Sequence, residues 1–112
     1  MGRQGARPVV ILADDDDAIT SNLAPFLERA GLTVHVASDG EAVLALVERL
    51  DPDGCILDVL MPRVDGREVL RRLRADGRWL PVVLLTAVGE STERAIALDE
   101  GADANRRLPG LP

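Results

Sequence analysis

Acidic side chains follow two apolar runs of this 112-residue chain, in positions where they could meet. One run, residues 9–13, leads directly into four consecutive aspartates that begin at Asp14, and another, residues 55–57, leads into Asp58. If the two runs are neighbouring parallel strands, Asp14, Asp15 and Asp58 meet at one edge of the sheet. Several carboxylates are tolerated together only with a bound cation or a shared proton. The pattern therefore predicts a site for metal-assisted chemistry.

The chemistry that such a site favours is phosphoryl transfer. A hard cation such as Mg²⁺ prefers oxygen ligands and usually combines one or two carboxylates with waters and a phosphate. A carboxylate beside Mg²⁺ can attack phosphorus and form an acyl phosphate, because the metal reduces the repulsion between the two anions. Asp58 lies on the opposite strand from the acidic pair and is the better nucleophile candidate. Thr86, after a later apolar run, places a hydroxyl at the same edge.

The elements that must position these residues follow from the hydrophobic pattern. Short apolar runs alternate with segments of helical period, which is typical of βαβ units around a parallel sheet. We expect strands near residues 9–13, 33–37, 54–58 and 81–86. We expect helices at about 17–30, from a Ser38-x-x-Glu41 capping box to Leu50, at about 66–75 and at about 91–100.

The order of the strands can be argued from their composition. Residues 9–13 and 82–85 are apolar at every position, as a strand covered on both faces requires, whereas residues 33–36 alternate like an edge strand. Right-handed crossovers then favour a doubly wound, flavodoxin-like α/β fold with the strand order 2-1-3-4-5, the fifth strand lying beyond Gly101. Ligands of such a sheet collect outside the carboxyl ends of strands 1 and 3.

Single residues carry further expectations. Pro25 lies inside the first helix, where we expect a kink or a late start of the regular part, and Gly31 is placed as the left-handed residue that follows that helix. Cys55 is expected to be a buried small hydrophobe, and Trp79 is expected to pack against the loop that enters the fourth strand. The arginines between residues 67 and 74 are interpreted as a solvated helix face.

The composition excludes several classes of function. The 19 acidic and 13 basic residues give a formal net charge of −6, which argues against a nucleic-acid-binding surface. No apolar stretch approaches the roughly 20 residues of a membrane-spanning helix, so we expect no membrane contact and a cytoplasmic location. The length suits one domain, and we expect a flexible N-terminal arm at residues 1–8 before a domain at 9–112.

Several stretches together resemble the response-regulator receiver domains of two-component signalling. They are ILADDDDAI (11–19), AGLTVHVASDGEAVLALV (30–47), ILDVLMPRVDG (56–66), VVLLTA (82–87) and GAD (101–103). An upstream aspartate pair, ILD-x-x-MP-x-x-DG and a downstream TA, all in register, make a highly specific combination. The resemblance implies a regulatory phosphoacceptor, which is not an enzyme acting on an outside substrate.

The resemblance also implies roles for the acidic residues. Asp58 would accept a phosphoryl group from the phosphohistidine of a partner sensor histidine kinase. Asp15, Asp58 and the backbone carbonyl of Leu60 would ligate Mg²⁺ together with water. Asp14 would act on the metal largely through water.

Other positions of the resemblance concern the phosphoryl group and the tail. Thr86 would hydrogen-bond a phosphoryl oxygen, the small Ala87 would leave access to it, and Gly66 would permit a sharp turn into the third helix. In the family, GAD is followed by an aromatic residue and then by a Lys that pairs with the phosphoryl group. Asn105 and Leu108 stand at those two positions here. Both switch residues of the family are therefore missing.

The last helix of the family has no counterpart before Pro112, so we expect a domain truncated at its C-terminus, with a weak fifth strand. A doubly wound sheet needs helices on both faces, and this loss would leave apolar surface near strands 3, 4 and 5 uncovered. We expect lowered stability, or cover by a second copy in a homodimer or by another partner.

Three classes of function remain open from the sequence. The first is a receiver that is phosphorylated on Asp58. The second is a pseudo-receiver, an interaction module that keeps the fold while the missing Lys and aromatic residue uncouple phosphorylation from output. The third is a Mg²⁺-dependent phosphatase or other enzyme, although no glycine-rich phosphate loop supports it.

Overall fold

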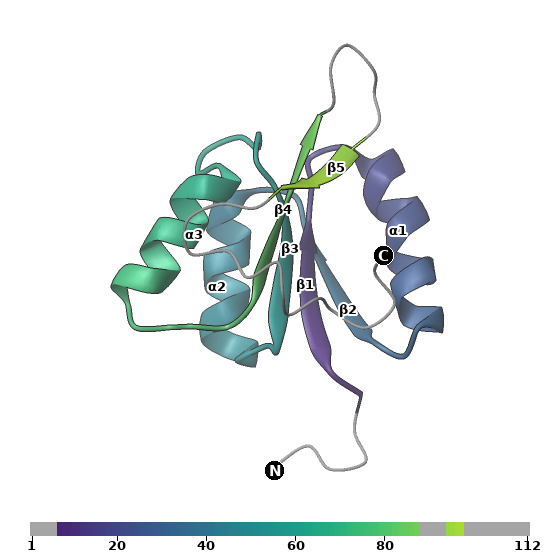
Figure 1. Cartoon of the computed structure of the whole chain (residues 1–112), viewed down its shortest axis with the longest axis horizontal. Helices are drawn as coiled ribbons and strands as arrows, with labels where there is room; N and C mark the ends of the chain where they lie inside the picture. Colours follow the sequence, from purple (N-terminus) through teal and green to yellow (C-terminus); the bar gives the residue numbers. More distant parts are fainter. Residues whose placement is uncertain (1–6, 88–93, 98–112) are drawn as a thin grey trace.

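The computed structural model of the chain describes residues 7–87 and 94–97 (Figure 1). The strands are β1 (Val9–Ala13), β2 (Thr33–Ala37), β3 (Gly54–Asp58), β4 (Val82–Ala87) and β5 (Arg94–Ala97). The helices are α1 (Asp17–Arg29), α2 (Gly40–Leu50) and α3 (Gly66–Ala75). The first four strands and the three helices confirm the elements that the sequence predicts, to within a residue or two at each end. None of the helices in this described part has the length and apolar character needed to cross a membrane.

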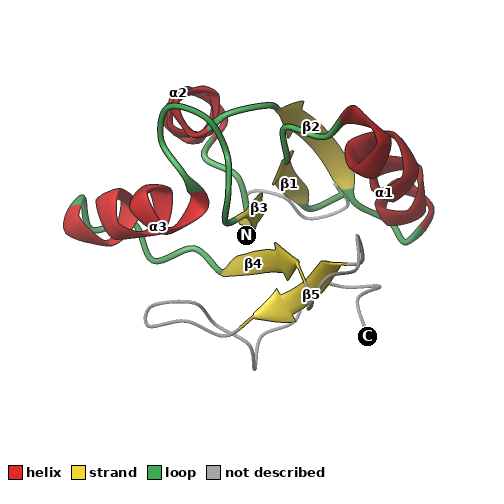
Figure 2. Ribbon diagram, turned by 90° about the horizontal axis from the view of Figure 1, so that it is seen from above, coloured by secondary structure: helices red, strands yellow, loops and turns green. Residues whose placement is uncertain are grey.

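The sheet has the strand order β2-β1-β3-β4-β5, and the order of its first four strands is the predicted one. Its first four strands are parallel, because each is joined to the next by a helix that crosses over the sheet. Figure 1 shows α1 on one side of the sheet and α2 and α3 on the other, and Figure 2 shows the same layers from above. The carboxyl ends of the parallel strands therefore lie at one edge, at the switch point beside β1.

The predicted fourth helix at about 91–100 is wrong. Residues 94–97 form β5, which pairs antiparallel with β4. The fifth strand therefore lies before Gly101, whereas the sequence predicts it after Gly101. The alternation of small and apolar residues in this short segment does not distinguish a helix from a strand. Pairing with β4 satisfies backbone groups along an otherwise open sheet edge, and this tertiary contact overrides a weak helix preference.

The core consists of two apolar clusters, one on each face of the sheet. Alternate residues of β1 enter different clusters, so Ile11 packs on the side of α2 and α3 while Leu12 packs on the side of α1. The expectation of uncovered apolar surface near strands 3 and 4 is wrong for the described residues. Ile56, Val83 and Leu85 are only 1%, 5% and 7% exposed.

The helices begin at aspartates that accept hydrogen bonds from the first turn. Asp16 accepts from the amide of Ala18 and so caps α1. The cap of α2 is Asp39 and not Ser38, because the Asp39 carboxylate accepts from the amide of Ala42 at 2.8 Å. The predicted capping box is therefore wrong, because the third residue after Asp39 is Ala42, whose methyl side chain cannot return the hydrogen bond. An aspartate and a serine are equally good N-caps, so only the backbone path decides between them.

Helix α1 is helical from Asp17 onward, so Pro25 does not delay its start. Pro25 lies in the third turn, where its missing N–H costs one intrahelical hydrogen bond. Gly31 has φ 105°, which confirms the predicted left-handed residue after the helix. Before α1, Arg7 donates a hydrogen bond to the carbonyl of Glu28 at 2.7 Å and so ties the start of the described chain to the end of this helix.

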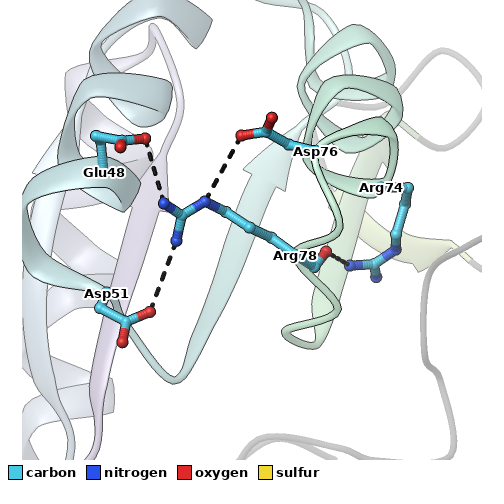
Figure 3. A network of polar contacts seen from close by, with 5 residues as sticks. All are labelled: Glu48, Asp51, Arg74, Asp76 and Arg78. Atoms are coloured by element: carbon cyan, nitrogen blue, oxygen red, sulfur yellow. Dashed lines mark hydrogen bonds and ion pairs between the residues drawn. The ribbon is translucent and has the colours of Figure 1, made fainter.

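Charged residues join the ends of α2 and α3. Arg78 lies between Glu48, Asp51 and Asp76, with N–O distances of 3.2, 3.7 and 3.9 Å (Figure 3). Arg74, expected on the solvated face, instead donates to the carbonyls that precede β4, those of Arg78 and Leu80, both at 2.9 Å. This arginine therefore shapes the loop between α3 and β4.

Trp79 does not pack into the loop as expected, because its side chain is 70% exposed. The Arg74 guanidinium lies 5.1 Å from the centre of its ring. A cation over an indole face is worth about 0.5–1 kcal/mol at an exposed site. The contact replaces the apolar packing that the sequence predicted.

Cys55 is fully buried in β3, as expected, and burial raises the pKa of its thiol to about 12. Since only the thiolate is a good nucleophile, we expect no reaction with a thiol-specific disulfide reagent at neutral pH in the folded protein. The same reagent should modify the thiol fully in denaturant. Stoichiometric modification of the native protein as fast as that of the denatured protein would contradict this expectation.

Candidate functional site

The three aspartates that the sequence singles out do meet at the carboxyl edge of the sheet. Ala13 of β1 pairs with Leu57 of β3, so the next residues along these strands, Asp14 and Asp58, are neighbours. One carboxylate oxygen from each of Asp14, Asp15 and Asp58 lies within 4.8 Å of the other two. The side chains of Asp14 and Asp58 are 1% exposed, whereas Asp15 faces solvent. The site is therefore a cluster of two buried acids and one exposed acid at the carboxyl edge of the sheet.

Backbone hydrogen bonds hold the acidic turn after β1 in place. The amide of Asp14 donates to the carbonyl of Ala37 at 3.2 Å, which extends the β1–β2 ladder by one residue. The amide of Asp16 donates to Oδ1 of Asp14 at 2.9 Å. This bond fixes the direction of the Asp14 carboxylate, and Asp16 then starts α1. Strand, turn and helix thus leave Asp14 and Asp15 little freedom to move apart from Asp58.

The segment after β3 is held as firmly. The amide of Val59 donates to the carbonyl of Leu85 in β4 at 3.0 Å, and the amide of Gly66 donates back to the carbonyl of Val59 at 2.9 Å. A Cβ atom on Gly66 would lie 2.3 Å from the carbonyl oxygen of Asp58. Gly66 is not among the glycines with a positive φ. Its role is therefore close approach to the Asp58 backbone, and this reason differs from the sharp turn expected from the resemblance.

The charge of this site is unfavourable without a cation. Two carboxylates buried side by side repel each other, and burial removes the water that would screen them. Oxygen-only ligands suit a hard cation, and Mg²⁺ bonds of roughly 2.1 Å place opposite ligands roughly 4.2 Å apart. The 4.8 Å limit on the three oxygens is close to that span. The donor set and its size therefore fit Mg²⁺.

For the other expected site residues, the structure gives the backbone position of some and does not describe the rest. Thr86 is at the carboxyl end of β4, one residue beyond Leu85, which pairs with Asp58. Leu60 lies in the segment between β3 and α3, and its side chain is 70% exposed. The side chains of Thr86 and Ala87 lie outside the described residues. Asn105 and Leu108 also lie outside the described residues. The expected loss of the family's last helix concerns the same part of the chain and is not tested.

Sequence reasoning missed two residues in the loops that follow β2 and β3, Asp39 and Arg63. Asp39 could have been found as a second candidate cap directly before Gly40. Arg63 has φ 68° and its guanidinium faces Asp39. No sequence signal predicts a left-handed arginine, because this conformation is mostly found for Gly, Asn and Asp.

Comparison with known sequences gives one consistent result. A family model described as the response regulator receiver domain matches residues 10–105. Response regulator MprA of Mycobacterium leprae is 45% identical over 94 residues, which is 84% of this chain and 41% of that protein. MprA of Mycobacterium avium is 43% identical over 94 residues, with the same two shares. The chain thus spans about two-fifths of the length of these curated relatives.

Solved structures agree with the sequence comparison. The receiver domain of the Francisella response regulator 1452 matches with a TM-score of 0.70 and 35% identity, covering 76% of this chain and 69% of that one. The chemotaxis response regulator CheY4 of Vibrio cholerae matches with a TM-score of 0.70 and 29% identity, covering 76% and 72%. With the fold, the acidic edge and these matches in agreement, the chain belongs to the response regulator receiver domain family of two-component signalling.

Proposed function

We propose that this chain is a phosphoacceptor whose Asp58 takes a phosphoryl group from the phosphohistidine of a sensor histidine kinase and thereby controls a signalling output. One observation carries the proposal: oxygens of Asp14, Asp15 and Asp58 gather within 4.8 Å although they come from two separate strand ends. Two of these carboxylates are buried, although burying carboxylates together is unfavourable unless a cation or a shared proton compensates them.

The acidic residues have distinct roles in this proposal. Asp15, Asp58 and the carbonyl of Leu60 would hold Mg²⁺, and Asp14 would act on it through water. The bound metal supplies positive charge that reduces the repulsion between the incoming phosphoryl group and the acceptor carboxylate. Asp58 is assigned as the acceptor because it is the aspartate of the ILD-x-x-MP-x-x-DG stretch and lies at the end of the strand opposite the acidic pair. Oδ1 of Asp14 accepts a hydrogen bond from the amide of Asp16, and Asp15 faces solvent.

The transfer itself needs little covalent machinery from the protein. An oxygen of Asp58 forms a bond to phosphorus while the bond from phosphorus to the imidazole nitrogen breaks. The imidazole keeps that electron pair, and the product on the receiver is an acyl phosphate. The Thr86 hydroxyl, from the end of the adjacent strand, donates a hydrogen bond to a phosphoryl oxygen.

The absence of lysine sharpens the expected metal dependence. The 13 basic residues other than His are all arginines, so no lysine ammonium is present to pair with the phosphoryl oxygens. Most of the charge neutralisation then falls on Mg²⁺. We therefore expect phosphoryl uptake to stop when the metal is chelated.

The test is phosphorylation by a small-molecule donor. The protein is incubated with acetyl phosphate and Mg²⁺, and its intact mass is measured before and after a parallel incubation with a chelator. We expect one base-labile phosphoryl group that requires Mg²⁺ and maps to the peptide containing Asp58.

The other outcomes identify other functions. No adduct on folded protein would contradict the proposal and leave an interaction module as the explanation. Steady release of phosphate at the rate of an enzyme would instead indicate a phosphatase. An adduct on a different residue would assign the acceptor role elsewhere.

A further inference from the structure

The segment between β3 and α3, residues 59–65, packs against the rest of the protein through buried side chains, although other side chains of the segment are exposed. Met61 and Val64 are buried, at 8% and 7% exposure, in the cluster shared with α2 and α3. Leu60 is 70% exposed, so buried and exposed side chains are interspersed along the segment. The carbonyl of Leu60 is a proposed metal ligand, and the position of this segment therefore bears on the site.

Arg63 is the conformational exception in this segment. Its φ of 68° lies in the left-handed region that side chains with a Cβ adopt at a cost. A glycine at this position would remove that cost. A non-glycine residue held in such a conformation beside a functional site suggests that its side chain has a role there.

The side chain of Arg63 links the segment to the start of α2. Its Nε lies 3.7 Å from Oδ2 of Asp39, and its Nη1 lies 3.9 Å from Oε1 of Glu41. Asp39 is itself fixed, because its Oδ1 accepts the hydrogen bond that caps α2. The guanidinium is therefore held between two acids of one helix end.

Close backbone contact at the same place shows that the link is short. A Cβ atom on Gly40 would lie 1.9 Å from the carbonyl oxygen of Val64. The segment thus rests directly on the first turn of α2, and Arg63 is adjacent to that contact. Among the described loops that follow β1, β2 and β3, Arg63 is the one basic residue.

We propose that Arg63 is a positioning residue for the metal site: its guanidinium, held by Asp39 and Glu41, fixes residues 59–65 against α2 and so places the Leu60 carbonyl beside Asp58. This inference rests on the proposed function, because it concerns the same metal site. Arg63 and Glu41 are 65% and 62% exposed, so their pairing is weak and is screened by salt. Its loss should lower Mg²⁺ affinity by about twofold to fivefold at low salt.

Three variants separate the guanidinium from the backbone. Arg63→Ala removes the guanidinium and keeps the conformational cost, Arg63→Gly removes both, and Arg63→Lys keeps a charge. Arg71→Ala is the matched control, because Arg71 is 71% exposed and pairs within α3 with Glu68, outside residues 59–65.

The measurements are calorimetric titration with Mg²⁺ alone and hydrogen exchange of the metal-free protein. The amide of Gly66, bonded to the carbonyl of Val59, reports on the segment. We expect weaker Mg²⁺ binding and faster exchange at residues 59–66 in Arg63→Ala and Arg63→Gly. Arg63→Lys should recover most of the affinity, Arg71→Ala should match the wild type, and high salt should reduce all differences.

Arg63→Gly is the decisive variant. If it binds Mg²⁺ as tightly as the wild type, the guanidinium has no positioning role and the inference is overturned. It is also overturned if Arg71→Ala weakens binding equally, or if the wild type binds no Mg²⁺. Parallel incubation with acetyl phosphate separates the two proposals. If Mg²⁺ binding depends on Arg63 but the wild type takes up no phosphoryl group, only the proposal that Asp58 is a phosphoacceptor is contradicted.

Discussion

Replacing Asp58 with Asn is expected to raise the free energy of unfolding of the metal-free protein by about 1–3 kcal/mol. The wild type buries Asp58 beside the equally buried Asp14, and Asp15 completes a group within 4.8 Å. Asn has nearly the same shape as Asp but no charge, so the repulsion is relieved without a cavity. Urea unfolding in the presence of a chelator measures this difference.

The same variant should lose the stabilisation that Mg²⁺ gives the wild type. A ligand that binds only the folded state stabilises it by about 2.7 kcal/mol at 100 times its dissociation constant. Asp17→Asn is the control, because it removes the same charge from the exposed first turn of α1, where an acid is favourable. The prediction fails if Asp58→Asn is less stable than the wild type without metal, or if both variants respond equally to Mg²⁺.

Replacing Gly66 with Ala is expected to destabilise the protein by about 2–3 kcal/mol. The added Cβ would lie 2.3 Å from the Asp58 carbonyl oxygen, so either the helix or the end of β3 must shift. Helix propensity predicts the opposite sign, because Ala is about 1 kcal/mol better than Gly inside a helix. The direction of the change therefore tests the close contact itself, again by urea unfolding.

Gly77→Ala provides the comparison for that substitution. Gly77 has φ 79°, and a Cβ added there would meet no atom within 4 Å, so only backbone strain of about 1 kcal/mol is expected. Gly66→Ala should also weaken Mg²⁺ binding, since it displaces the backbone of Asp58, while Gly77→Ala should leave it unchanged. Equal stability of Gly66→Ala and the wild type would show that the contact relaxes at little cost.

Most of the fold could be predicted because its signals are local. Buried parallel strands need apolar residues at every position, and residues 9–13 and 82–85 meet that requirement. Right-handed crossovers then leave few strand orders. The same logic brought Asp14 and Asp58 to one edge, since both lie at the ends of strands that a crossover makes neighbours.

The wrong predictions share one cause. A local sequence pattern carries no information about which distant segments contact a residue in the folded protein. Residues 94–97 pair with β4, although their short apolar pattern is equally compatible with the helix expected from the sequence. Trp79 is 70% exposed and lies 5.1 Å from the Arg74 guanidinium, although we expect it from the sequence to pack against the loop before β4. Asp39 caps α2 in place of Ser38, because the backbone path between strand and helix decides which oxygen reaches Ala42.

The sequence by itself determined the family, the order of the first four strands and the three carboxylates, because each depends on residue types at spacings set by regular secondary structure. Only the tertiary structure decided which of these acids are buried, why Gly66 must lack a side chain and where Arg63 is held. Those features arise from contacts between segments that are distant along the chain, or from a left-handed backbone that no residue preference predicts.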